Sequence, residues 1–217
     1  MVEPEKVYSI EEAASIVKTL PAPKFDQTVT LTFKMGVDPR QSDQMVRGTC
    51  PLPNGSGKDV RVLVFAEGDA ATQAKNAGAE HVGLEALIKE VQGGFMDFDA
   101  VIATPAAMSE VRKLGRALGP RGLMPNPKTG TVTDDTEAAV KAVKAGRVDF
   151  RLDKNGNISV PIGKASFEAA ALVENGRAVV DAVSAARPAT AKGVFIVNGT
   201  LAATMSPGLT VDISAWG

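Results

Sequence analysis

The sequence predicts a fold that mixes α/β and α+β architecture, with a split α+β domain formed by both termini and an α/β domain inserted between them. Three observations predict it. Segments near both ends alternate apolar and polar residues, the period of half-buried strands. The middle of the chain has nearly continuous apolar runs separated by helical patterns, as in a parallel sheet covered on both faces. A turn-forming stretch at 53–57 lies where the first pattern gives way to the second.

The terminal regions, 1–54 and 147–217, supply the elements of the split domain. Apolar residues at helical spacing follow Ser9, and Glu12 completes a capping box, so a helix is expected over residues 9–20, ending before Pro21. The other elements expected here are a strand at 29–35, an extended segment at 45–52, a hairpin of strands at 148–152 and 158–162, a helix at 166–186, and strands at 194–197 and 209–213.

The central region, 55–146, has a different pattern. Residues 60–66 form an apolar run without alternation, which predicts a strand buried on both faces. The elements expected after it are a helix at 69–77, a strand at 81–83, a helix at 84–92, a strand at 100–104, a helix at 105–118 and a helix at 135–145. Alternating strands and helices predict a parallel sheet. The two chain crossings into and out of this domain predict a hinge.

Composition is that of an ordinary globular protein: 44% hydrophobic residues, 23% charged residues and no apolar run long enough to span a bilayer. Neither a signal peptide nor a transit peptide is expected from residues 1–6, so we expect a cytoplasmic protein without a membrane partner. The 24 basic and 25 acidic residues leave a formal net charge of −1. Bulk charge therefore does not predict a nucleic-acid-binding protein.

Catalytic and metal-binding patterns are missing from the sequence. No phosphate-binding loop, no glycine-rich dinucleotide motif and no nucleophile elbow occurs. The single cysteine, Cys50, and the single histidine, His81, cannot form a disulfide or a zinc site, and each is better explained as a structural residue. The pair Asp134-Asp135 is typical of a helix N-terminus. We therefore expect no enzyme, no cofactor and no metal.

One stretch is basic and rich in glycine and proline. Between Arg112 and Thr133 there are five basic residues and no acidic one. Four glycines and three prolines in residues 114–130 predict a shaped loop rather than regular structure. From composition alone, the segment is either a phosphate-binding loop or a structural plug whose basic side chains pair with carboxylates.

The same stretch carries a family resemblance. Residues 114–132 resemble the signature of the L-one family, the ribosomal proteins of the mobile large-subunit stalk. Further matching motifs stand in the expected order from Tyr8 to Ile213: Lys24-Phe-Asp26, Gly36-Val-Asp-Pro-Arg-Gln-Ser-Asp-Gln44, Val46-Arg-Gly-Thr49, Met96-Asp-Phe-Asp99 and Gly163-Lys-Ala-Ser-Phe167. The resemblance implies a discontinuous α+β domain with a Rossmann-like domain inserted into it, as the periodicity predicts independently.

The resemblance also implies a function. It predicts a monomer, when free, that binds large-subunit rRNA, contacts other components of that subunit, assists release of deacylated tRNA from the exit site and represses translation by binding its own mRNA. The implied RNA-binding residues are Lys24, Phe25, Thr28, Lys164, Ser166, Asn198, Thr204, Met205 and Ser206. Secondary or interdomain contacts are implied for Arg116, Arg121 and Lys128.

Three alternatives to this interpretation stay open. Phe25 and Met205 can instead be core residues. The chain can be an unrelated α/β enzyme with an active site between its domains, or an RNA-binding relative outside the ribosome. Hydroxyl and amide groups such as those of Thr28 and Asn198 suit the ribose 2′-OH and base edges of RNA, and such readout relies on shape more than on net charge.

Overall fold

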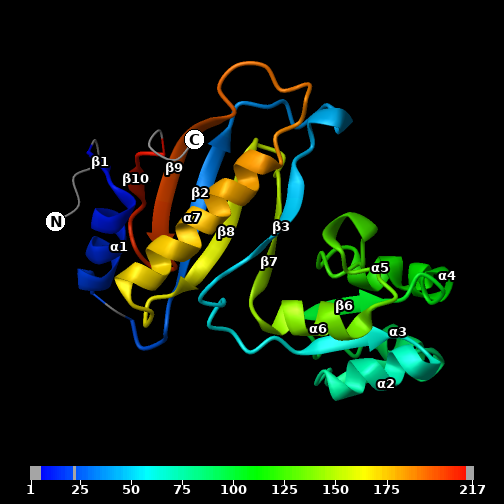
Figure 1. Cartoon of the computed structure of the whole chain (residues 1–217). Coiled ribbons are helices and arrows are strands. Elements are labelled where there is room, and N and C mark those ends of the chain that lie inside the picture. Colours follow the sequence, from blue (N-terminus) through cyan, green and yellow to red (C-terminus); the bar gives the residue numbers. More distant parts are fainter. Residues whose placement is uncertain (1–5, 22, 214–217) are drawn as a thin grey trace. The chain divides into compact units, whose positions relative to one another are not determined.

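The computed structural model describes residues 6–21 and 23–213 and divides the chain into two compact units (Figure 1). Unit 1 joins the residues up to Gly57 with those from Gly146 onward, and unit 2 comprises Lys58–Ala145. The sequence predicts the two junctions after residues 54 and 146. The predicted fold class, a mixture of α/β and α+β, is confirmed.

Unit 1 contains a five-stranded sheet in the order β1-β10-β9-β2-β8. The strands are β1 (Val7–Tyr8), β2 (Thr28–Met35), β8 (Asn157–Lys164), β9 (Ile196–Ala203) and β10 (Leu209–Val211). All neighbours are antiparallel except β1 and β10, so the start of β2 lies beside the ends of both β8 and β9. Sequence alternation predicted β2 well, but β9 is longer than the expected strand at 194–197.

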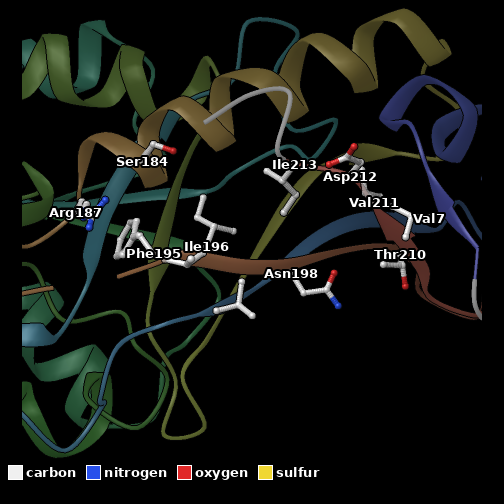
Figure 2. A pocket seen from close by; sticks show the side chains of 12 residues that line it. Val7, Ser184, Arg187, Phe195, Ile196, Asn198, Thr210, Val211, Asp212 and Ile213 are labelled. Carbon is white, nitrogen blue, oxygen red and sulfur yellow. The ribbon is translucent and has the colours of Figure 1, made fainter. Parts of the chain in front are cut away.

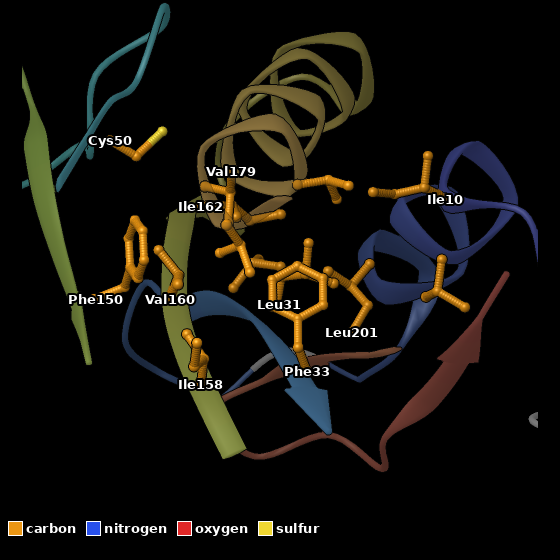
Figure 3. Packing of buried hydrophobic residues seen from close by; sticks show 14 of the residues in the cluster. Ile10, Leu31, Phe33, Cys50, Phe150, Ile158, Val160, Ile162, Val179 and Leu201 are labelled. Carbon is orange, nitrogen blue, oxygen red and sulfur yellow. The ribbon is translucent and has the colours of Figure 1, made fainter. Parts of the chain in front are cut away.

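Helices α1 (Ile10–Thr19) and α7 (Ala169–Ala185) cover one face of this sheet (Figures 1 and 3). The capping box at Ser9 forms, because the Ser9 hydroxyl accepts a hydrogen bond from the Glu12 amide and the Glu12 carboxylate accepts one from the Ser9 amide. Fully buried Leu31, Phe33 and Leu201 point from the sheet toward these helices (Figure 3). Helix α7 begins at 169 rather than 166, because residues 165–167 form a turn.

A separate two-stranded ribbon pairs β3 (Arg47–Pro51) with β7 (Arg147–Arg151). Its apolar side, with Cys50 and Phe150, joins the core under α7 (Figure 3). The chain that leaves the ribbon is held by the buried Asn175 side chain of α7, which accepts from the Asn54 amide at 3.0 Å and donates to the Gly55 carbonyl at 3.1 Å. The returning chain also passes closely there, because a Cβ added at Gly146 would lie 2.5 Å from the Gly55 Cα. Both junctions are therefore anchored within unit 1.

Unit 2 contains a parallel three-stranded sheet in the order β5-β4-β6, with β4 (Val62–Phe65) in the centre, β5 (His81–Gly83) and β6 (Ala100–Ala103). Apolar side chains cover both faces of the sheet, as the apolar run at 60–66 predicts. The helices are α2 (Gly68–Asn76), α3 (Glu85–Gln92), α4 (Met108–Val111), α5 (Gly115–Leu118) and α6 (Thr136–Lys144).

One predicted element of unit 2 is wrong. The single helix expected at 105–118 is broken into α4, a 3-10 turn η2 (Arg112–Leu114) and α5, and it begins three residues late. The Thr104 hydroxyl accepts a hydrogen bond from the Ala107 amide, which holds residues 104–107 in a turn. Beyond this region, Val132 forms a parallel bridge with Ala103, which local periodicity did not predict.

Residues 6–21 and 23–213 contain neither a membrane-spanning helix nor a cluster of metal-binding side chains. No helix there combines the length and apolar character that crossing a bilayer requires. No group of three or more histidine, cysteine, aspartate or glutamate side chains there is placed to hold a metal ion.

Candidate nucleic-acid interface

Eight of the nine residues that the sequence implied for RNA binding lie at or just before one end of the unit 1 sheet, although they come from three distant segments. We call this end the β2-start site. Its segments are the approach to β2, the end of β8 and the turn after β9. The residues are Lys24, Phe25, Thr28, Lys164, Ser166, Thr204, Met205 and Ser206. They meet because β2 is antiparallel to both of its neighbours.

Thr204 links the turn after β9 to the first residue of β2. Its hydroxyl accepts a hydrogen bond from the Thr28 amide at 3.2 Å and can donate to the Thr28 carbonyl at 3.3 Å. The last backbone-paired residues of the two strands are Val29 and Ala203, so this side chain extends the strand pairing by one position. The Thr204 hydroxyl therefore fixes the shape of the site from within it.

Two residues that were not implied for RNA binding, Asp26 and Gln27, hold the remaining segments together. The Asp26 carboxylate accepts from both the amide and the hydroxyl of Ser166, at 3.1 and 2.8 Å. The buried Gln27 side chain accepts from the Met205 amide at 2.8 Å, and the Gln27 carbonyl accepts from the Ala165 amide at 2.8 Å. The only sequence signal for Asp26 was its place in the family motif Lys24-Phe-Asp26. No local pattern marks Gln27 as buried.

The positive charge of the site sits on two lysines. The Lys164 ammonium donates to the Thr28 hydroxyl at 3.0 Å, and the side chain is half-buried. Its aliphatic part lies against Gly57, where an added Cβ would come within 2.8 Å of the Lys164 Cγ. Lys24 is exposed. Lys164 is thus a positioned cation, since both its stem and its head have fixed neighbours.

Phe25 and Met205 are exposed by 51% and 73%, which contradicts the alternative that they are core residues. Large apolar side chains that face water beside positioned polar groups are typical of binding surfaces. The Ser206 hydroxyl instead accepts a hydrogen bond from the Ala203 amide at 2.8 Å within its own turn. Its side chain is therefore already engaged in closing the turn after β9.

Asn198 is not part of the β2-start site. It lies six positions before Thr204 on β9, about 20 Å away at roughly 3.4 Å per residue, and it is paired in register with Lys34. Its side-chain amide makes no hydrogen bond with any residue that the structure describes. It lines a pocket of about 570 Å³ beside β9 and β10, together with Thr210 (Figure 2). Sequence proximity to Thr204 was misleading, because a strand places its two ends far apart.

A row of hydroxyl groups connects Asn198 with the β2-start site. Because cross-strand partners share a face, the sheet face opposite the two helices carries Thr28, Thr30, Thr32, Ser159 and Thr200. We call this surface, with Lys34 and Asn198 at its far end, the hydroxyl face. The Thr32 and Ser159 hydroxyls are 3.0 Å apart. The face offers several small donors and acceptors on a rigid sheet.

The residues implied for secondary contacts belong to unit 2. Arg116 lies on α5 and Arg121 in the following loop, and both are exposed. Neither forms an ion pair with any described residue, whereas Lys113 pairs with Glu110 at 2.6 Å. The plug alternative, in which these arginines pair with carboxylates, is therefore not supported. Lys128 lies in η3 (Pro127–Thr129), and its side chain is outside the described part of the structure.

Fold and site together define a class of two-unit α/β proteins, in which a discontinuous unit presents a polar sheet surface with exposed apolar side chains at its end. Comparison with known proteins identifies the family. The model of the ribosomal protein L1p/L10e family matches residues 15–207. The chain belongs to this family, as the resemblance predicted.

Two similar proteins, each named large ribosomal subunit protein uL1, illustrate the relationship. The protein of Bifidobacterium longum subsp. infantis is 56% identical over 211 residues, which cover 97% of this chain and 92% of that protein. The protein of Beutenbergia cavernae is 53% identical over 213 residues, covering 98% of this chain and 90% of that protein. Because the family consists of ribosomal proteins, the chain is not an enzyme, which removes the enzyme alternative.

Proposed function

We propose that this chain is a structural constituent of the large ribosomal subunit stalk and binds large-subunit rRNA through the β2-start site and the hydroxyl face. The observation that carries the proposal is the convergence of Lys164 and Thr204 on Thr28 at one end of a sheet, three positions after the exposed Phe25, all four implied for RNA binding. Its place of action is the cytoplasmic ribosome.

The chemistry of this surface suits RNA. Ribose 2′-hydroxyls both donate and accept hydrogen bonds, and the shallow minor groove of an RNA helix displays them. The hydroxyl face offers threonine and serine groups that can do the same. Phe25 can stack on an unpaired base, a contact that is indifferent to base identity. With Lys164 as the positioned cation, such a surface needs no large excess of positive charge, which agrees with a net charge of −1.

The proposal has two finer parts. When the free monomer is in excess, the same surface would bind a segment of the chain's own mRNA that is folded like the rRNA segment. This binding would repress translation. Release of deacylated tRNA from the exit site would use unit 2, where Arg116 and Arg121 are exposed and not paired with carboxylates of the described chain. Exposed arginines are suited to phosphate groups. Other components of the large subunit complete the set of partners.

Co-sedimentation with large subunits that lack their own copy of this protein tests the proposal. The full chain should sediment with these subunits and bind isolated large-subunit rRNA. Lys164→Met keeps the aliphatic stem and removes the ammonium, so it should lower rRNA affinity by roughly 10- to 100-fold, the effect of one charged hydrogen bond. Lys18→Met, an exposed lysine on α1, is the matched control and should stay within about twofold.

Three outcomes are informative. Failure of the unsubstituted chain to bind rRNA would refute the proposal. Binding to rRNA without sedimentation with subunits would favour an RNA-binding relative outside the ribosome. Equal loss of affinity in the Lys164 and Lys18 variants would show that the β2-start site is not the contact surface.

A further inference from the structure

The β3–β7 ribbon of unit 1 has one polar face that the proposed RNA surface does not include. Its apolar face, with Cys50 and Phe150, is buried in the core. Alternation along both strands places the other side chains outward. In register, the outward pairs are Arg47 with Arg151, Thr49 with Asp149, and Pro51 with Arg147. This face therefore carries three arginines and one aspartate.

Arg47 and Arg151 are directly opposite each other at the end of the ribbon where β3 begins and β7 ends. The Leu152 amide donates to the Val46 carbonyl at 2.9 Å, so the neighbouring Arg47–Arg151 position is a non-hydrogen-bonded pair. Opposed Cα atoms in such a pair are only about 4.5 Å apart, and like charges there are unfavourable. Both arginines are exposed, and neither forms an ion pair with any part of the chain that the structure describes.

The rest of the face does not neutralise this pair. Asp149 lies on the same strand between Arg147 and Arg151, so the four charged residues still sum to a positive charge. Arg147 has a buried terminal nitrogen with no hydrogen-bond partner in the described residues. A buried donor without an acceptor is costly in free energy. Among the described residues, the Asp149 carboxylate forms no ion pair with any of the three arginines of this face.

One hairpin links this arginine pair to the far end of the hydroxyl face. A hairpin connects Arg151 to β8, and its Asp153 amide donates to the Asn157 carbonyl at 2.8 Å. Lys34, at the Asn198 end of the face, donates to the Asn155 carbonyl in the same hairpin at 2.6 Å. The hairpin after Arg151 thus ties the ribbon to the end of the hydroxyl face that carries Lys34.

We propose that Arg47 and Arg151 together bind a backbone phosphate of the RNA that lies on the hydroxyl face. The inference rests on the proposed rRNA binding and adds a contact that family motifs did not assign. Each guanidinium presents a planar fork that matches two phosphate oxygens, and one phosphate between them removes the repulsion of the opposed pair. The contact positions the RNA and reads no sequence.

The salt dependence of rRNA affinity tests this contact on the full chain. The slope of log affinity against log salt counts displaced counterions, about 0.7 to 0.9 per phosphate contact. The double variant Arg47→Gln, Arg151→Gln should reduce the slope by about 0.7 to 0.9, the value for one phosphate contact. It should also weaken binding roughly tenfold at low salt. Its melting temperature should not fall, because the like-charge repulsion is relieved. Arg177→Gln, an ion-paired arginine on α7, is the matched control and should leave the slope unchanged.

A conservative variant separates charge from shape. Arg47→Lys keeps the positive charge but loses the fork, so it should keep the slope and lower the affinity about two- to fivefold. An unchanged slope in the double variant, while the unsubstituted chain binds rRNA, would overturn the phosphate contact alone. If the unsubstituted chain does not bind rRNA, the proposed function itself fails, and the arginine contact fails with it.

Discussion

Replacing Phe25 by alanine tests whether an apolar contact with RNA, rather than packing, explains this residue. A fully buried phenylalanine costs roughly 3 to 5 kcal/mol of stability when truncated to alanine. Phe25 is 51% exposed and leaves no closed cavity behind, so less than half of that stability, roughly 1 to 2 kcal/mol, should be lost. Stacking of one base on an aromatic ring contributes about 1 to 3 kcal/mol, or roughly a 5- to 150-fold change in affinity.

Two measurements on the same protein preparation check this expectation. Thermal unfolding gives the stability change, which should appear as a melting temperature lower by roughly 2 to 8 °C for a chain of this size. Filter binding of large-subunit rRNA at one fixed salt concentration gives the affinity. Phe33→Ala is the matched control, because Phe33 lies on the adjoining strand β2 with 0% exposure and should lose the full roughly 3 to 5 kcal/mol.

Phe25 and Phe33 should respond differently to truncation. Phe25→Ala should lose more affinity than stability, and Phe33→Ala should mainly lose stability. A Phe25 variant that melts as early as the Phe33 variant would show that the side chain is packed in solution. A Phe25→Ala variant that keeps rRNA affinity within twofold would show that no base contacts Phe25.

Two further predictions concern the units separately. Deleting Lys58–Ala145 and joining Gly57 to Gly146 through a short linker should leave a folded unit 1 with most of its rRNA affinity, because both junctions are anchored within that unit; circular dichroism and filter binding check this. In unit 2, hydrogen bonds from Lys58 and then Arg61 hold the pKa of Asp99 below its usual range. A carboxylate with a depressed pKa stabilises the fold above the unfolded-state pKa of about 3.9 and loses this effect as pH falls through the folded value. The melting temperature should therefore fall from about pH 5 downward, and Asp99→Asn should make that fall shallower.

Local sequence was sufficient for most of the secondary structure. The alternation of Val29, Leu31 and Phe33 predicts β2, and the apolar run at 60–66 predicts β4, because side-chain periodicity follows directly from backbone geometry. The Ser9 capping box predicts the start of α1 for the same reason, since its hydrogen bonds join residues three apart. The helix predicted at 105–118 was wrong because the turn at Thr104 and the 3-10 turn at Arg112–Leu114 are small local effects beside a strong apolar pattern.

The site was chosen by family motifs, and only the tertiary structure decided which of these residues meet. Strand pairing joins Thr28 to Lys164 and to Thr204, and no local signal specifies contacts across more than 130 positions. The extended strand β9 separates Asn198 from Thr204, although they are only six positions apart in the sequence. Burial of Gln27 and the opposition of Arg47 and Arg151 likewise depend on register. Register is set by which faces the core buries, and that is a property of the whole domain rather than of any one segment.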